Sequence, residues 1–211
     1  MNPARSTLSL LFLFASCIAA PSLAQHQITD LAAPNAPIPV AGPRVAFETS
    51  VGRVVVELYP EKAPRTVANF LSYVRDGHYN GTVFHRVIPN LLIQGGAFTP
   101  DLQQKPERAP IANEANNGLS NLRGTLSAAR RPNEKDSATA QFFINTVDNR
   151  QLDYRGDATP MMTGYCVFGR VVEGMDIVDK IRLVPTGPRP PLPADVPLTA
   201  VLVERASTVE P

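Results

Sequence analysis

One arginine and one glutamine stand among apolar residues in a short stretch of the chain, and both could do chemistry. Arg86 lies in Phe84–Pro89, which is typical of a buried strand, and Gln94 precedes a Gly-Gly pair. A guanidinium stays charged and presents a rigid fork of donors, so burial is costly unless it has a partner or a function. In a water-poor pocket, Arg86 could polarise a carbonyl or donate to a developing lone pair. Pairing with a carboxylate such as Glu114 is an open alternative, as is a purely structural role for Gln94 at a strand end.

A second block, Gln141–Asn145, has the same character. Side chains alternate along a strand, so Phe142 and Phe143 are predicted to face opposite sides. One of them would then belong to the core and the other could line a pocket, although both could also be core residues. The two blocks together suggest an apolar pocket with a few fixed hydrogen-bond donors.

Other kinds of site find little support in the sequence. His26, His78 and His85 lack metal-ligand spacing, and neither a nucleophile elbow nor a glycine-lysine phosphate loop occurs. His85 is expected to be a satisfied core histidine that points to the face opposite Arg86. Cys166 lies in an apolar strand and is expected to be a buried, inert thiol. We therefore expect no metal and no cofactor.

Composition limits the possible partners. The chain has 211 residues, of which 44% are hydrophobic, and a formal net charge of +1. This charge gives no reason to expect nucleic acid or an anionic membrane surface as a partner. The absence of Trp also argues against a stacking platform for single strands. The length favours one domain with extensions.

The first 24 residues are predicted to be a signal peptide. Arg5 precedes the apolar run Leu8–Ala20, which is too short to span a bilayer, and small residues before Gln25 suit a signal peptidase. A lipobox-like sequence ending at Cys17 offers an alternative, in which that cysteine becomes a lipidated N-terminus. Either way the sequence predicts export, without a membrane span in the mature chain.

After the signal peptide, residues 25–43 are rich in Pro and Ala and are predicted to form an extended arm. Beyond it, the pattern is one of short β-branched strands punctuated by Gly and Pro. The expected strands are 45–49, 54–58, 83–88, 91–94, 124–128, 141–145, 165–172 and 198–204, with helices at 63–76 and 174–181 and a Pro-rich turn at 185–197. Few helices and many strands favour a barrel or a sandwich over a parallel α/β sheet.

Four motifs resemble those of the cyclophilin family of peptidyl-prolyl cis-trans isomerases, in a form similar to bacterial periplasmic members. The resemblance covers about residues 44–206, and its motifs are Phe84–Pro89 with Gln94–Gly96, Gly124–Ala129, Ser137–Ile144 and Val167–Met175. It implies a mainly β fold, a closed eight-stranded antiparallel cyclophilin-like β-barrel capped by two α-helices. We accordingly expect an isomerase domain at residues 44–208.

The resemblance also implies roles for individual residues. Arg86 takes the position of the family's essential arginine and Gln94 that of its active-site glutamine. The proline pocket would be formed by Leu91, Leu92, Phe143 and Leu152, and the rim that binds the substrate backbone by Ala129, Arg130 and Gln141. Tyr165 stands where eukaryotic members often have His, and Gln151 replaces a tryptophan of members that bind cyclosporin tightly. Arg130 departs from a common Asn, and the Leu91–Leu92 pair from a common Phe-Met pair.

The expected activity is rotation about Xaa-Pro peptide bonds without a covalent intermediate, with Arg86 as the key donor. The expected partners are proline-containing polypeptides in the periplasm, whose folding the protein would assist. We further expect a monomer that binds cyclosporin weakly at most, because of Gln151. The alternative function is a binding or chaperone module that holds proline-containing segments without isomerising them.

Overall fold

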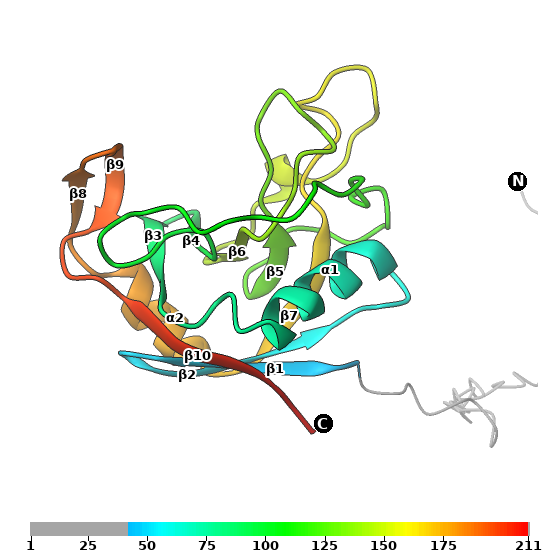
Figure 1. Ribbon diagram of the computed structural model, residues 1–211. Helices are drawn as coiled ribbons and strands as arrows, with labels where there is room; N and C mark the ends of the chain where they lie inside the picture. The colour runs from blue at the N-terminus through cyan, green and yellow to red at the C-terminus, as the bar shows by residue number, and fades with distance from the viewer. Residues whose placement is uncertain (1–41, 211) are drawn as a thin grey trace, which may run out of the picture. The chain divides into compact units, whose positions relative to one another are not determined.

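Short strands rich in β-branched residues close into an antiparallel barrel (Figure 1). The structure, a computed structural model, describes residues 42–210, so the predicted signal peptide and most of the predicted arm lie outside the described residues. The barrel order is β1-β10-β3-β4-β6-β5-β7-β2, which confirms the predicted eight-stranded fold. The barrel strands are β1 (Arg44–Thr49), β2 (Gly52–Leu58), β3 (Thr82–Ile88), β4 (Leu92–Gly95), β5 (Thr125–Ala128), β6 (Phe142–Asn145), β7 (Val167–Glu173) and β10 (Leu202–Val209).

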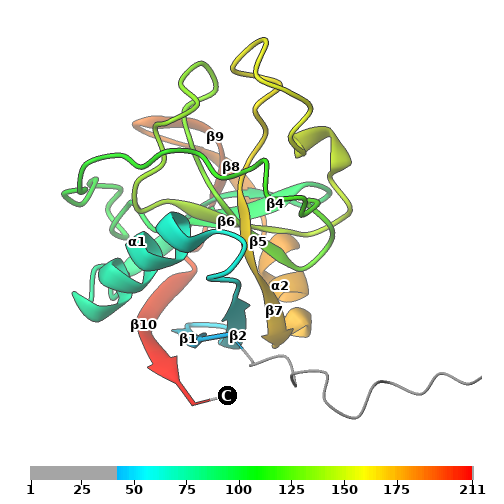
Figure 2. The same ribbon diagram turned by 90° about the vertical axis from the view of Figure 1, so that its right-hand side faces the viewer.

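Two helices pack on the core of the barrel from different sides (Figure 2). Helix α1 (Pro64–Arg75) begins with a proline, which suits a helix start because its missing N–H would be unpaired there. Helix α2 (Met175–Arg182) follows Gly174, which has a left-handed backbone conformation with φ 84°. Both helices bury apolar side chains in the same cluster as the inward-facing strand residues. None of the helices within residues 42–210 is long and apolar enough to cross a membrane.

The Pro-rich segment after α2 forms a hairpin, so its prediction as a turn is wrong. Strands β8 (Thr186–Arg189) and β9 (Leu192–Pro197) pair with each other and stand apart from the barrel sheet. Val196 is fully buried in a small cluster with Val83 and Leu102, which fixes the hairpin against the outer face of β3. Prolines are tolerated here because this two-stranded ribbon has two open edges.

A β-bulge in β3 decides where the arginine of that strand points. Phe84 pairs with Gly95 and Arg86 pairs with Gln94. Two steps along β3 thus correspond to one step along β4, so β3 carries one extra residue. Phe84 and Val87 both enter the central core, whereas His85 and Arg86 both lie on the outer face, where they line the same cavity. The prediction that His85 and Arg86 face opposite sides is therefore wrong.

Candidate functional site

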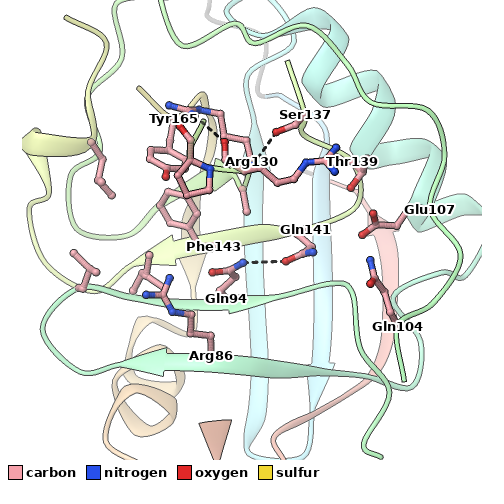
Figure 3. Close-up of a pocket in the computed structure, with 16 residues that line it drawn as sticks. Arg86, Gln94, Gln104, Glu107, Arg130, Ser137, Thr139, Gln141, Phe143 and Tyr165 are labelled. Atoms are coloured by element: carbon pink, nitrogen blue, oxygen red, sulfur yellow. Dashed lines mark hydrogen bonds between the residues drawn. The ribbon is translucent and has the colours of Figure 1, made fainter. Parts of the chain in front are cut away.

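The side chains of Arg86, Gln94 and Phe143 form a row across three neighbouring strands. Arg86 pairs with Gln94 between β3 and β4, and Gln94 pairs with Phe143 between β4 and β6. Directly opposite residues of paired strands point to the same face of a sheet. The fold thus brings an arginine, an amide and an aromatic ring together on the outside of the barrel (Figure 3).

This row lines a cavity of about 740 Å³. Its apolar part is a cluster separate from the central core, in which Leu92, Ala129 and Phe143 are buried. Phe142, by contrast, belongs to the central core. The interpretation in which one phenylalanine is a core residue and the other lines a pocket is therefore confirmed. The predicted residues that line the cavity are Arg86, Leu91, Leu92, Gln94, Ala129, Arg130, Gln141, Phe143, Leu152 and Tyr165.

The two glutamines of the site are hydrogen-bonded to each other. Gln94 donates from Nε2 to Oε1 of Gln141 at 2.9 Å, as the dashed line in Figure 3 shows. The backbone carbonyl of Gln141 also accepts a hydrogen bond of 3.0 Å from the N–H of Ala129. These bonds fix the rotamer of Gln94 beside Arg86 and join the polar part of the site to its rim.

Arg86 is 45% exposed at the edge of the cavity, and its charge is partly balanced by Asp195 of β9. The Nε–Oδ2 distance is 3.5 Å, and such an exposed ion pair contributes little to stability. Glu114 does not serve as this partner. Its carboxylate instead accepts hydrogen bonds from the N–H groups of Arg65 and Thr66 at the start of α1.

Arg130 joins two loops at the rim, its own and the one before β7. Its guanidinium donates to the carbonyls of Gly164 at 2.8 Å, Pro160 at 2.7 Å, and the adjacent Arg131 and Pro132 at 3.1 Å each. It also lies 4.6 Å from the ring centre of Tyr165, a cation–π distance. Because four of its five N–H donors are occupied by these carbonyls, the Arg130 side chain mainly shapes the wall of the cavity.

Gln151 is the one predicted site residue that the cavity does not include. It is exposed on a short 3₁₀ helix, Arg150–Leu152, and donates from Nε2 to Oδ1 of Asn149 at 3.1 Å. Its neighbour Leu152 does reach the apolar cluster.

Six further residues complete the lining of the cavity and were not predicted from the sequence. Two long loops carry them, 99–123 and 130–139, where no periodicity marks a side chain as facing a pocket. They are Gln104, Glu107, Arg131, Pro132, Ser137 and Thr139. Isolated β-bridges pin the loops, one between Ile111 and Ala138.

Two groups that could have carried other chemistry are buried. Cys166 is 2% exposed, which confirms a buried cysteine, and burial raises the pKa of its thiol to about 12, as expected for an unreactive thiol. His85 is 4% exposed, and burial lowers the pKa of its imidazole to about 4. Its Nδ1 has no hydrogen-bond partner within the described residues, so the prediction of a satisfied histidine is wrong in that respect. Residues 42–210 contain no cluster of three or more His, Cys, Asp or Glu arranged to hold a metal ion.

Comparisons of the sequence and of the fold with known proteins point to the same family. The model of the cyclophilin type peptidyl-prolyl cis-trans isomerase/CLD family matches residues 44–207. Peptidyl-prolyl cis-trans isomerase B of Escherichia coli strain K12 is 52% identical over 166 residues, which cover 79% of this chain and 99% of the relative. The isomerase cyp18 of Streptomyces antibioticus is 55% identical over 162 residues, covering 77% and 96%.

One solved structure shows the same fold at low sequence identity. A cyclophilin type isomerase from Cryptosporidium parvum superposes with a TM-score of 0.67 at 23% identity, over 80% of this chain and 98% of that one.

Proposed function

The chain belongs to the cyclophilin-type peptidyl-prolyl cis-trans isomerases and has their isomerase activity, and we propose that Arg86 is the donor that drives the rotation. The observation that carries this proposal is the row of Arg86, Gln94 and Phe143 across β3, β4 and β6. The row sets a charged fork of N–H groups beside an apolar pocket. A proline residue has two parts that match these: an apolar ring, which suits the pocket, and a nitrogen atom, which faces the donors.

The chemical task is to lower a rotational barrier. Resonance gives the amide C–N bond partial double-bond character, which creates a barrier of about 18–20 kcal/mol. In the twisted transition state this resonance is lost, and the prolyl nitrogen becomes pyramidal with a lone pair. A donor at that nitrogen therefore stabilises the transition state more than either planar ground state, which is the condition for catalysis.

The side chains divide this task among them. The buried cluster of Leu92, Ala129 and Phe143, with Leu91 and Leu152 beside it, holds the proline ring while the preceding carbonyl turns. Arg86 donates to the prolyl nitrogen. Gln94, held by Gln141, places the guanidinium and the substrate backbone. A bound substrate covers part of the exposed guanidinium, and its donor strength increases as water leaves.

Turnover of a short Xaa-Pro peptide, followed as cis-to-trans conversion, tests this assignment. We expect activity in the wild-type protein and little in Phe143→Ala, because that change removes the buried aromatic ring of the proline pocket. Full activity of a folded Phe143→Ala variant would contradict the pocket. Suppression of client aggregation that survives loss of turnover would instead favour a holding function.

The proposed setting is the periplasm, where the protein would assist the folding of exported, proline-containing clients. The support is the charged start, short apolar run and small residues of positions 1–24. The test is the refolding of a protein limited by proline isomerisation, which catalytic amounts of the mature chain should accelerate.

A further inference from the structure

A second groove lies on the other side of Arg86 from the proline pocket. Residues 192–195 of the β8–β9 hairpin form one wall, and His85 and Phe98 form the other. Figure 1 shows the hairpin standing beside β3, and Val196 anchors it there in a buried apolar cluster. The groove encloses about 430 Å³, enough for a large side chain.

The chemistry of the groove favours an uncharged, apolar occupant. Leu192, Pro193, Ala194 and Phe98 supply most of its surface. Its one cation, Arg86, is paired with Asp195 at 3.5 Å. His85 adds no charge near neutral pH, because burial lowers the pKa of its imidazole to about 4. A carboxylate or ammonium group placed there would lose hydration against a mostly apolar lining, in which the Arg86–Asp195 pair is the main charged feature.

The groove adjoins the proline pocket. Arg86 and Gln141 line both cavities, so a polypeptide with its proline in the first cavity has the second within reach of a neighbouring side chain. This adjacency favours the substrate chain itself as the occupant over a separate ligand.

We propose that the groove between β3 and the β8–β9 hairpin is a specificity subsite that binds an apolar side chain of the substrate next to the isomerised proline. This rests on the proposed function, since the substrate chain must first place its proline beside Arg86. The hairpin would then set which proline-containing sequences the enzyme prefers.

Two peptide series test the subsite. In one, the residue before proline is Gly, Leu, Phe, Glu or Lys; in the other, the residue after proline is varied in the same way. Turnover gives kcat/KM, and calorimetry gives the affinity independently of turnover. In one of the two series we expect Leu and Phe to exceed Gly about tenfold in both measurements, a typical discrimination by an apolar pocket.

A groove-filling variant provides the decisive comparison. Ala194 is exposed on the hairpin, so Ala194→Phe should fold, turn over the Gly peptides within about twofold of wild type, and lose the preference for Leu and Phe. Ala158→Phe is the matched control, since this exposed alanine lines none of these cavities. Ala194→Glu should shift the preference from Leu toward Lys, which gives a second readout if the phenylalanine variant does not fold.

The possible results distinguish a failure of the subsite proposal from a failure of the proposed catalytic role. Equal values for all residues in both series, or a preference that survives both Ala194 variants, would overturn the subsite and leave the isomerase intact. An absence of turnover with every peptide would contradict the proposed catalytic role of the site, and the calorimetric affinities would still decide whether the groove selects apolar residues.

Discussion

At the scale of single residues, Arg86 meets two competing demands. A guanidinium carries five N–H donors in a fixed fork, so holding one of them does not occupy the rest. Asp195 approaches Nε, which leaves the terminal nitrogens available toward the cavity. The arginine is therefore an ion-pair partner and an available donor at once. Lysine, with a single ammonium group, would have to exchange one role for the other.

His85 leads to a prediction about stability and pH. The pKa of its imidazole is about 4 in the folded protein, below its ordinary value of 6.5, chiefly because of burial. Between these pH values the unfolded chain binds more protons, so stability falls as the pH drops from 6.5 to 4, by about 3 kcal/mol from this residue. Urea unfolding at both pH values should show a smaller loss for His85→Leu than for wild type. Equal losses would contradict the assignment.

Gln151 leads to a prediction about an inhibitor. We expect cyclosporin to inhibit peptide turnover weakly, because a polar, exposed glutamine stands where tightly binding family members have tryptophan. Its amide is hydrogen-bonded to Asn149 and offers little apolar surface. Gln151→Trp should strengthen inhibition. Tight inhibition of the wild-type protein in the same assay would refute the prediction.

At the scale of elements, the strands of the barrel and its two helices could be predicted. The bulge in β3 and the β8–β9 hairpin, which orient and flank the site residues, could not. β-branched runs and helical spacing identified each of these strands and helices to within a few residues, with β10 the least accurate. The bulge in β3 could not be predicted from the order of apolar and polar residues. Simple alternation along the strand would place His85 and Arg86 on opposite faces. The β8–β9 hairpin was not predicted because prolines argue against strands. The residues that bury its Val196 also come from distant segments of the chain.

Helix α1 depends on a distant carboxylate, which gives a prediction for this element. Glu114 accepts hydrogen bonds from the N–H groups of Arg65 and Thr66 and from the Thr66 hydroxyl, at 3.1, 2.9 and 2.7 Å. We expect Glu114→Ala to lower the free energy of unfolding by about 1–2 kcal/mol with unchanged kcat/KM. The control is Glu61→Ala, an exposed acid just before the helix. A Glu114→Ala protein as stable as this control would show that the cap contributes nothing.

At the scale of the whole molecule, the site is assembled from segments that lie far apart along the chain. The barrel begins with β1 at Arg44 and ends with β10 at Val209, and the family match covers residues 44–207. The residue roles came from the resemblance in motif order, since spacing alone left Arg86 undecided between an ion pair and catalysis. Asp195 could not be identified as the partner of Arg86, because it lies in the distant Pro-rich segment and only the folded hairpin brings it to β3.

The export prediction belongs to this scale and is tested by mass. The intact mass of the protein recovered from cells should correspond to a chain that begins at Gln25, and gel filtration should show a monomer. A mass that fits a lipidated chain beginning at Cys17 would favour the alternative, and the unprocessed mass would contradict export by either route.

The central claim is that Arg86 stabilises the twisted amide, and one measurement tests it most directly. This is kcat/KM for an Xaa-Pro peptide in wild type, Arg86→Ala and Arg86→Lys, with the fold of each variant checked by urea unfolding. We predict a loss of about 10²–10³-fold for Arg86→Ala, the usual effect of removing one transition-state donor, and only partial retention in Arg86→Lys. Because Arg86 is exposed, both variants should stay folded. A folded Arg86→Ala protein with wild-type kcat/KM would contradict the account.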